Sequence, residues 1–106
     1  MASQYLVEIF LPLFDRKGKR FPERFHKAVR EELVARFGGM TAHIRSPAVG
    51  LWKPSDRSPT ERDLVIIYEV MTGRLDRSWW STYRKQLEQD FRQRELVIRA
   101  HRITVL

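Results

Sequence analysis

The side chains best suited to chemistry stand at alternate positions within apolar segments, and they are Glu8, His43, Arg45, Glu69, Arg99 and His101. A histidine oriented by a carboxylate can take up or release a proton near neutral pH. Arginine presents a fork of donors that suits a carboxylate or another planar anion. If these side chains meet on one surface, they form a polar pocket that can bind or deprotonate a small anionic or aromatic molecule.

The segments that carry these residues read as strands, and two amphipathic helices separate them. Residues 63–71 form the longest apolar run, and their many β-branched side chains predict a central strand. Stripes of apolar residues at helical spacing predict the two helices, the first ended by Gly38 and Gly39 and the second begun by Asp76 as N-cap. The predicted order is strand 5–13, helix 22–37, strand 40–46, strand 63–71, helix 76–94 and strand 97–105.

This order of elements is the split βαβ pattern of the ferredoxin-like α+β fold. Right-handed crossovers then predict a four-stranded antiparallel sheet of strand order 4-1-3-2 with both helices on one face. The chain of 106 residues is long enough for a single domain with its own core. Residues 47–62 contain three prolines and a glycine, so they are expected to form an irregular loop that packs through Trp52.

Alternation assigns each strand residue to one of two faces. The helices are expected to cover the face with Val7, Ile9, Leu11, Met40, Ala42, Ile44, Leu64, Ile66, Tyr68, Val70, Leu96 and Ile98. The opposite face then carries Leu6, Glu8, Phe10, Thr41, His43, Arg45, Val65, Ile67, Glu69, Met71, Val97, Arg99, His101 and Ile103. Because a large apolar patch is a liability in water, we expect a homodimer in which two helix-free faces pack together and the Trp52 loop reaches over the edge.

The polar residues of the helix-free face are expected to form a row. Glu8 and Glu69 fall on adjacent central strands, where opposed Cβ atoms lie about 5 Å apart. Basic residues flank them on both edge strands, so the row reads basic, acidic, acidic, basic. It is either a charge ladder that fixes register and dimer geometry or the lining of a ligand pocket. The spacing of its histidines and glutamates does not match a metal site, so neither metal nor cofactor is expected.

Composition narrows the class of protein. There is no cysteine, which excludes disulfides and thiol chemistry, and no apolar stretch reaches the length of a membrane span. Without a basic-then-apolar leader, the protein is expected to be soluble and cytoplasmic. The net charge of +7 favours acidic partners.

Two further features have a plain interpretation and a functional one. The densest basic cluster is Arg16, Lys17, Lys19 and Arg20 around Gly18, and it is either a solvated loop or a contact for an anion or phosphate. His26, beside Phe25 on the first helix, is interpreted as a surface or packing residue rather than as a catalytic one.

The chain resembles families whose members share this plan. Its two helices and doubly apolar sheet look like the dimeric α+β barrel group, which includes small monooxygenases and stress-responsive barrel domains. More narrowly, an uncharacterised bacterial family of stand-alone domains is similar in Phe37-Gly38-Gly39, in Trp52, in Glu61 before the central strand and in residues 83–91 of the second helix. For the group, the resemblance implies a small-molecule site between sheet and helices or at the dimer face. It carries over no catalytic residue.

The leading hypothesis is a noncatalytic dimeric domain that binds a small ligand. The alternative is a cofactor-independent enzyme of monooxygenase or isomerase type, in which a histidine of the polar row is the base, a glutamate orients it and an arginine holds the anion. A nucleic-acid-binding module ranks third. Such modules stack bases on aromatic residues of the open sheet face, whereas here Phe10 is joined by Glu8 and Glu69, which repel phosphate.

Overall fold

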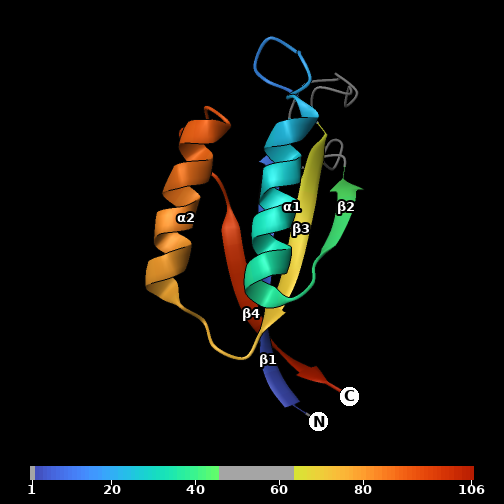
Figure 1. Ribbon diagram of the computed structural model, residues 1–106, viewed down its shortest axis with the longest axis vertical. Coiled ribbons are helices and arrows are strands. Elements are labelled where there is room, and N and C mark those ends of the chain that lie inside the picture. The colour runs from blue at the N-terminus through green and yellow to red at the C-terminus, as the bar shows by residue number, and fades with distance from the viewer. Residues whose placement is uncertain (1, 46–63) are drawn as a thin grey trace, which may run out of the picture.

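The computed structural model describes residues 2–45 and 64–106, and it has the predicted order of elements (Figure 1). These are β1 (Ala2–Pro12), α1 (Glu23–Phe37), β2 (Thr41–Arg45), β3 (Val65–Thr72), α2 (Arg77–Asp90) and β4 (Ile98–Val105). The strands form one antiparallel sheet in the order β2-β3-β1-β4, which is the predicted order read from the other edge. The ferredoxin-like α+β fold is therefore confirmed.

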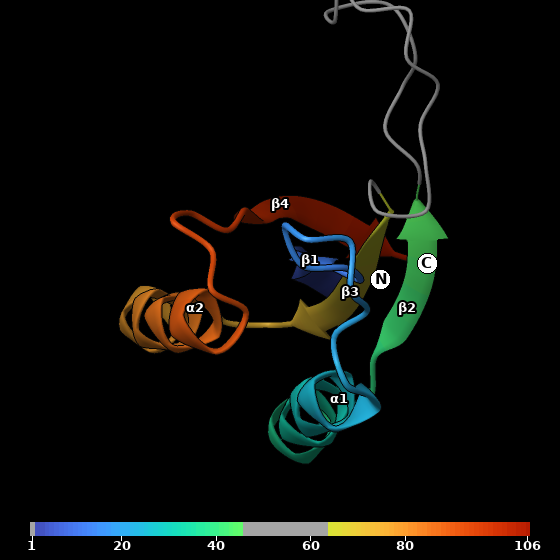
Figure 2. The ribbon, with the colours of Figure 1, turned by 90° about the horizontal axis from the view of Figure 1, so that it is seen from above.

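Both helices lie on one side of the sheet, as Figure 2 shows in a view along the strands. Alternation in β1 and β3 turns one set of apolar side chains toward them, and Val7 pairs with Val70 and Ile9 with Tyr68 across the two strands. The resulting core comprises Val7, Ile9, Leu11, Phe21, Val29, Leu33, Tyr68, Val70, Trp80, Tyr83, Leu87, Phe91 and Leu96. Each large apolar side chain buried in this way contributes about 1.5–3 kcal/mol to folding.

Local signals fix where the helices begin and end. Asp76 is the N-cap of α2, because its Oδ1 accepts a hydrogen bond from the backbone N–H of Trp79 at 3.0 Å. Gly38 ends α1 in the left-handed region with φ of 82°. The end of α2 was predicted near residue 94 but comes at Asp90, since Arg92 adopts a positive φ of 53° that no helix continues.

The helices do not cover the whole face that was assigned to them. β2 is the edge strand, as its mixed pattern predicted, and it is exposed along its full length. Ile44 is 59% exposed, so the expectation that the helices cover it is wrong. The reason is geometric: α1 packs through Val29 and Leu33 on the cluster formed by β1 and β3, and β2 lies beyond it (Figure 2).

Candidate functional site

The helix-free face carries the predicted pair of carboxylates. Glu8 on β1 and Glu69 on β3 are direct partners in the antiparallel register. Residues paired in this way project on the same side of the sheet, and their Cβ atoms are separated by about 5 Å. Arg99 on β4 is the partner of Glu8 on its other side, and Thr41 on β2 is the partner of Glu69. One register row therefore holds both acids at the centre of the sheet.

Each carboxylate has its own cationic or imidazole partner. Arg99 donates from Nε to Oε1 of Glu8 at 2.9 Å, and its guanidinium carbon lies 4.8 Å from the centre of the Phe10 ring. Nε2 of His43 lies 3.0 Å from Oε1 of Glu69, a contact that reaches diagonally because His43 is the register partner of Ile67. The register row itself ends at Thr41, and the predicted order of basic, acidic, acidic and basic side chains is completed by the diagonal contact of His43.

The partners differ in exposure from the acids they hold. The side chains of Glu8 and Glu69 keep 14% and 22% of their accessible surface, whereas Arg99 and His43 keep 57% and 43%. The two acids are thus mostly buried, and the two basic side chains beside them are exposed to solvent and accessible to a ligand. Guanidinium and imidazole groups so placed can meet an anion, and the His43–Glu69 contact has the geometry of a base held by an orienting carboxylate.

The other predicted site residues flank this row without joining it. His101 is the partner of Leu6, two residues along the strands from the Glu8 row, and Arg45 is the partner of Val65 near the opposite end of β3. Both side chains are exposed. Trp52 and Glu61 lie outside the described residues, as does the predicted loop over 47–62.

Apolar residues surround the charges on the helix-free face. Met71 is 52% exposed and Val97 is 53% exposed, which are large fractions for side chains of this kind. Ile67 differs, since it is fully buried although it lies outside the main core cluster. Ile67 was assigned to the face that a partner subunit would cover, yet it is already buried within the single chain. Its partners on the neighbouring strands are the bulky side chains of Phe10 and His43.

A hollow of about 420 Å³ borders the row at Glu69. It lies where β2 begins, and its lining from the helix-free face includes Leu6, Thr41 and Met71. Gly39 and Met40, in the connection from α1 to β2, line its other side. This volume is within the range of small-molecule sites, which makes the hollow the place on this face where a ligand would have room beside a carboxylate.

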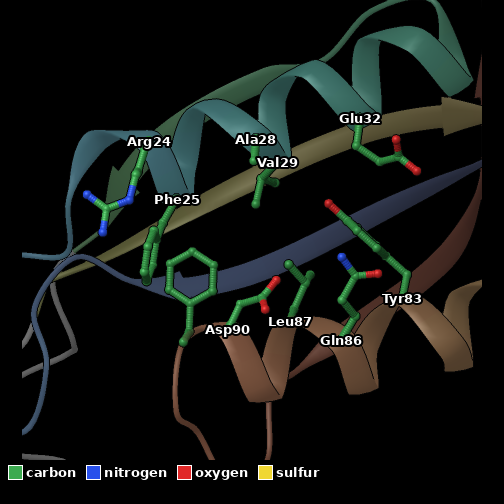
Figure 3. Close-up of a pocket in the computed structure, with 10 residues that line it drawn as sticks. Arg24, Phe25, Ala28, Val29, Glu32, Tyr83, Gln86, Leu87 and Asp90 are labelled. Carbon is green, nitrogen blue, oxygen red and sulfur yellow. The ribbon is translucent and has the colours of Figure 1, made fainter.

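A second hollow was not predicted from the sequence. It is a groove of about 550 Å³ between α1 and α2, and Figure 3 shows Phe25 and Val29 of α1 facing Tyr83 and Leu87 of α2 across it. Burial, and then the negative charges of Glu32 and Asp90, raise the pKa of the Tyr83 hydroxyl. The apolar stripe from Tyr83 to Phe91 indicates residues that line the groove, but nothing in the sequence indicates that a groove lies between the two helices.

Within the described parts of the chain, no group of three or more histidine, aspartate or glutamate side chains is arranged to hold a metal ion. No helix in these parts is long and apolar enough to cross a membrane. Comparison with known proteins gives no match to a family model, to a curated protein or to a solved structure. The site must therefore be interpreted from its own geometry.

Proposed function

We propose that the protein is a small-ligand-binding domain that works as a homodimer, packed through its helix-free face. The observation that carries the proposal is the Glu8–Glu69 register pair, with Arg99 and His43 as its partners, on a face whose other residues are mostly apolar. A solvated surface has no need of such compensation, because water screens exposed charges. A surface that becomes desolvated does need it.

The dimer follows from what the face exposes. Met71 and Val97 are half exposed on the same side of the sheet as the partly buried Leu6 and Phe10. Two copies related by a two-fold axis would cover these side chains with the same surface of the partner, as closed symmetric dimers do. The charged row would then stand at or near the interface, and the hollow beside Glu69 would gain a second wall.

The ligand expected at this site is small and either anionic or aromatic. Arg99 and Arg45 offer guanidinium groups that are exposed at the rim, while Phe10 and Met71 offer apolar contact. Nucleic acid suits the face less well, because Glu8 and Glu69 occupy the central strands on which bases would have to stack.

A matched pair of valines tests the dimer. Val97 is 53% exposed on the helix-free face, and Val34 is 46% exposed on α1. Multi-angle light scattering at micromolar concentration is expected to give twice the chain mass of 12.7 kDa for the wild type and for Val34→Glu, but the single mass for Val97→Glu. A wild-type protein that is monomeric at that concentration would overturn the proposal.

A second candidate function is cofactor-independent proton transfer on a small molecule. It is favoured by one contact, the 3.0 Å approach of His43 Nε2 to the Glu69 carboxylate. That carboxylate would hold the imidazole in a fixed orientation, which a general base requires.

A further inference from the structure

The largest of the described hollows is lined by the loop before α1 and by the segment after α2. Figure 1 shows that these two segments lie at the same end of the molecule. The hollow is a cleft of about 820 Å³. Seven of the twenty basic residues in the chain line it, against a single acid, Asp15. The seven are Arg16, Lys17, Lys19, Arg20, Arg24, Arg92 and Arg94. We call this hollow the basic cleft.

The cations of the basic cleft are available to a ligand. All seven side chains belong to exposed residues, and no salt bridge between described residues includes any of them. Arg30, Arg36 and Arg99, which lie elsewhere, are each paired with an acid. The seven positive charges repel one another. A bound anion would reduce this repulsion and so stabilise the folded protein.

The one acid in the basic cleft is already engaged with the loop. Oδ1 of Asp15 accepts hydrogen bonds from the backbone N–H groups of Lys17 and Lys19, each at 2.9 Å. The backbone N–H of Asp15 donates to the carbonyl of Lys19 at 2.7 Å, and Gly18 takes the positive φ of 81° that closes the turn. The loop is thus shaped by its own hydrogen bonds, and its basic side chains are left to point outward.

The basic cleft continues into the groove between the helices. Arg24, Phe25 and Phe91 line both hollows. From these shared residues the groove runs along Val29 and Leu87 toward Tyr83, and Figure 3 shows the apolar side chains of the two helices directed into it. Its rim carries two acids, Asp90 near Phe25 and Glu32 farther along toward Tyr83 (Figure 3). One continuous depression therefore has a cationic end and a largely apolar groove with two acids on its rim.

We propose that this depression binds an organic phosphate with an apolar body, the phosphate lying in the basic cleft and the body lying along Phe25 toward Tyr83. Arginine forks match phosphate oxygens in pairs, and a phosphate ester carries close to two negative charges at neutral pH. The cations lie at one end of the depression and Glu32 lies toward the other, so the phosphate is directed to the basic cleft. A nucleic-acid strand fits less well, because the cations converge on one hollow instead of following a path across the surface.

The basic cleft and the groove lie on the helix side of the sheet and use no residue of the helix-free face. Binding of the phosphate is therefore independent of the dimer and of the ligand proposed there, and either proposal can fail alone.

Isothermal titration with octyl phosphate tests the ionic half of the site. The variant Lys19→Gln/Arg20→Gln removes two cations from the basic cleft, and Arg77→Gln/Arg84→Gln removes two from a separate hollow between α2 and β4. We expect the first variant to lose about tenfold or more in affinity, because it removes two cations that would form charge-assisted hydrogen bonds with the phosphate. The second should bind like the wild type. Equal losses in both variants would mean attraction by net charge alone and would overturn the site.

A pair of alanines on α1 tests the apolar half. Ala28 lines the groove and Ala35, also exposed, does not. Ala28→Trp should weaken octyl phosphate while leaving the weaker binding of inorganic phosphate unchanged, and Ala35→Trp should alter neither. If octyl phosphate and inorganic phosphate bind equally well to the wild type, the groove takes no part and the proposal is wrong.

Two other outcomes would also contradict it. Octanol binding as tightly as octyl phosphate would show that the cations do not contribute. A single-stranded RNA oligonucleotide that binds more tightly than octyl phosphate at physiological salt, and loses affinity in Lys19→Gln/Arg20→Gln, would make the basic cleft a nucleic-acid surface. Should that variant fold poorly by circular dichroism, Arg16→Gln/Lys17→Gln makes the same change in charge within the same cleft.

Discussion

His26 of α1 and Tyr68 of β3 share a hydrogen bond inside the core: Nδ1 of His26 lies 2.8 Å from the hydroxyl oxygen of Tyr68. On the other side of the ring, Nε2 lies 3.3 Å from the carbonyl oxygen of Pro12. A carbonyl oxygen can only accept, so Nε2 carries the ring proton and Nδ1 accepts the hydrogen of the Tyr68 hydroxyl. A neutral imidazole therefore ties α1 to two strands of the sheet.

This arrangement predicts a loss of stability in mild acid. Burial lowers the pKa of His26 below its ordinary value of 6.5, and the charges of Arg30 and Arg20 act in the same direction against Glu23. Below pH 6.5 the unfolded chain binds a proton at His26 that the folded chain does not bind until lower pH. The free energy of unfolding should therefore fall as the pH falls through 6.5, by at most about 1.4 kcal/mol per pH unit from this group.

Urea denaturation at several pH values between neutrality and mild acid measures this dependence. His26→Gln is the control, because its amide can donate to Pro12 and accept from Tyr68 but cannot titrate. Subtracting its curve removes the contributions of all other groups, including the carboxyls. Parallel curves for the two proteins would contradict the assigned role of His26.

The contact between Glu8 and Arg99 predicts that a second substitution, at Glu8, restores stability lost by a first one at Arg99. Arg99→Met should destabilise the protein by about 0.5–1 kcal/mol, because it leaves Glu8 directly opposite Glu69 with one compensating partner fewer. Methionine keeps an apolar stem near the Phe10 ring, so the change is mainly one of charge.

Adding Glu8→Gln to Arg99→Met should then restore part of the lost stability, since the remaining carboxylate faces a neutral amide. Urea denaturation of the wild type, both single variants and the double variant forms the cycle that isolates this coupling. The idea fails if Glu8→Gln destabilises the Arg99→Met protein as much as it destabilises the wild type.

Substitution of Gly38 is expected to lower stability through backbone strain alone. Its φ is 82°, and a Cβ built at this position has no atom within 4 Å. Gly38→Ala should therefore lower the free energy of unfolding by about 1–2 kcal/mol through strain and not through a clash. Gly39→Ala is the matched control, since it is equally open and lacks the positive φ. Equal effects of the two substitutions on thermal unfolding would argue against this explanation.

Much of the fold could be predicted because the relevant signals are local or periodic. Alternation along residues 5–13 and 63–71 separates the two faces and places Glu8 and Glu69 on the same one. It still allows the register to slip by two residues, and the structure shows that the two acids are direct partners. No local or periodic pattern in the sequence indicates how far across the sheet the helices extend. Ile44 alternates like a covered residue, yet it is exposed because β2 lies beyond α1.

Contacts between residues that are far apart in the sequence are harder to predict. The sequence indicates only a surface or packing role for His26, because its polar partners, Pro12 and Tyr68, are 14 and 42 residues away. The basic cleft was seen only as the loop from Arg16 to Arg20. Since β1 and β4 are antiparallel neighbours, the chain leaving β1 and the chain entering β4 lie at one end of the sheet, so the predicted topology already brought Arg92 and Arg94 beside that loop.

The His43–Glu69 contact predicts which histidine would matter in an enzyme. His43 has an orienting carboxylate at 3.0 Å, whereas His101 is the register partner of Leu6 and has no carboxylate partner among the described residues. If the helix-free face transfers protons, His43→Ala should abolish turnover, and His101→Ala should leave most of it. The measurement is depletion of small carboxylates and aromatic compounds from a metabolite mixture, followed by mass spectrometry for the wild type and both variants.

A binding protein without catalysis gives a different pattern in the same mixture. No compound is consumed by the wild type, and the ligand is detected as a rise in melting temperature, since a ligand at a hundredfold its dissociation constant adds about 2.7 kcal/mol of stability. That rise should shrink in Arg99→Met, which removes the exposed guanidinium beside Glu8. Turnover that is equal in the wild type, His43→Ala and His101→Ala would remove the enzymatic candidate, because no other imidazole lies on the described part of this face.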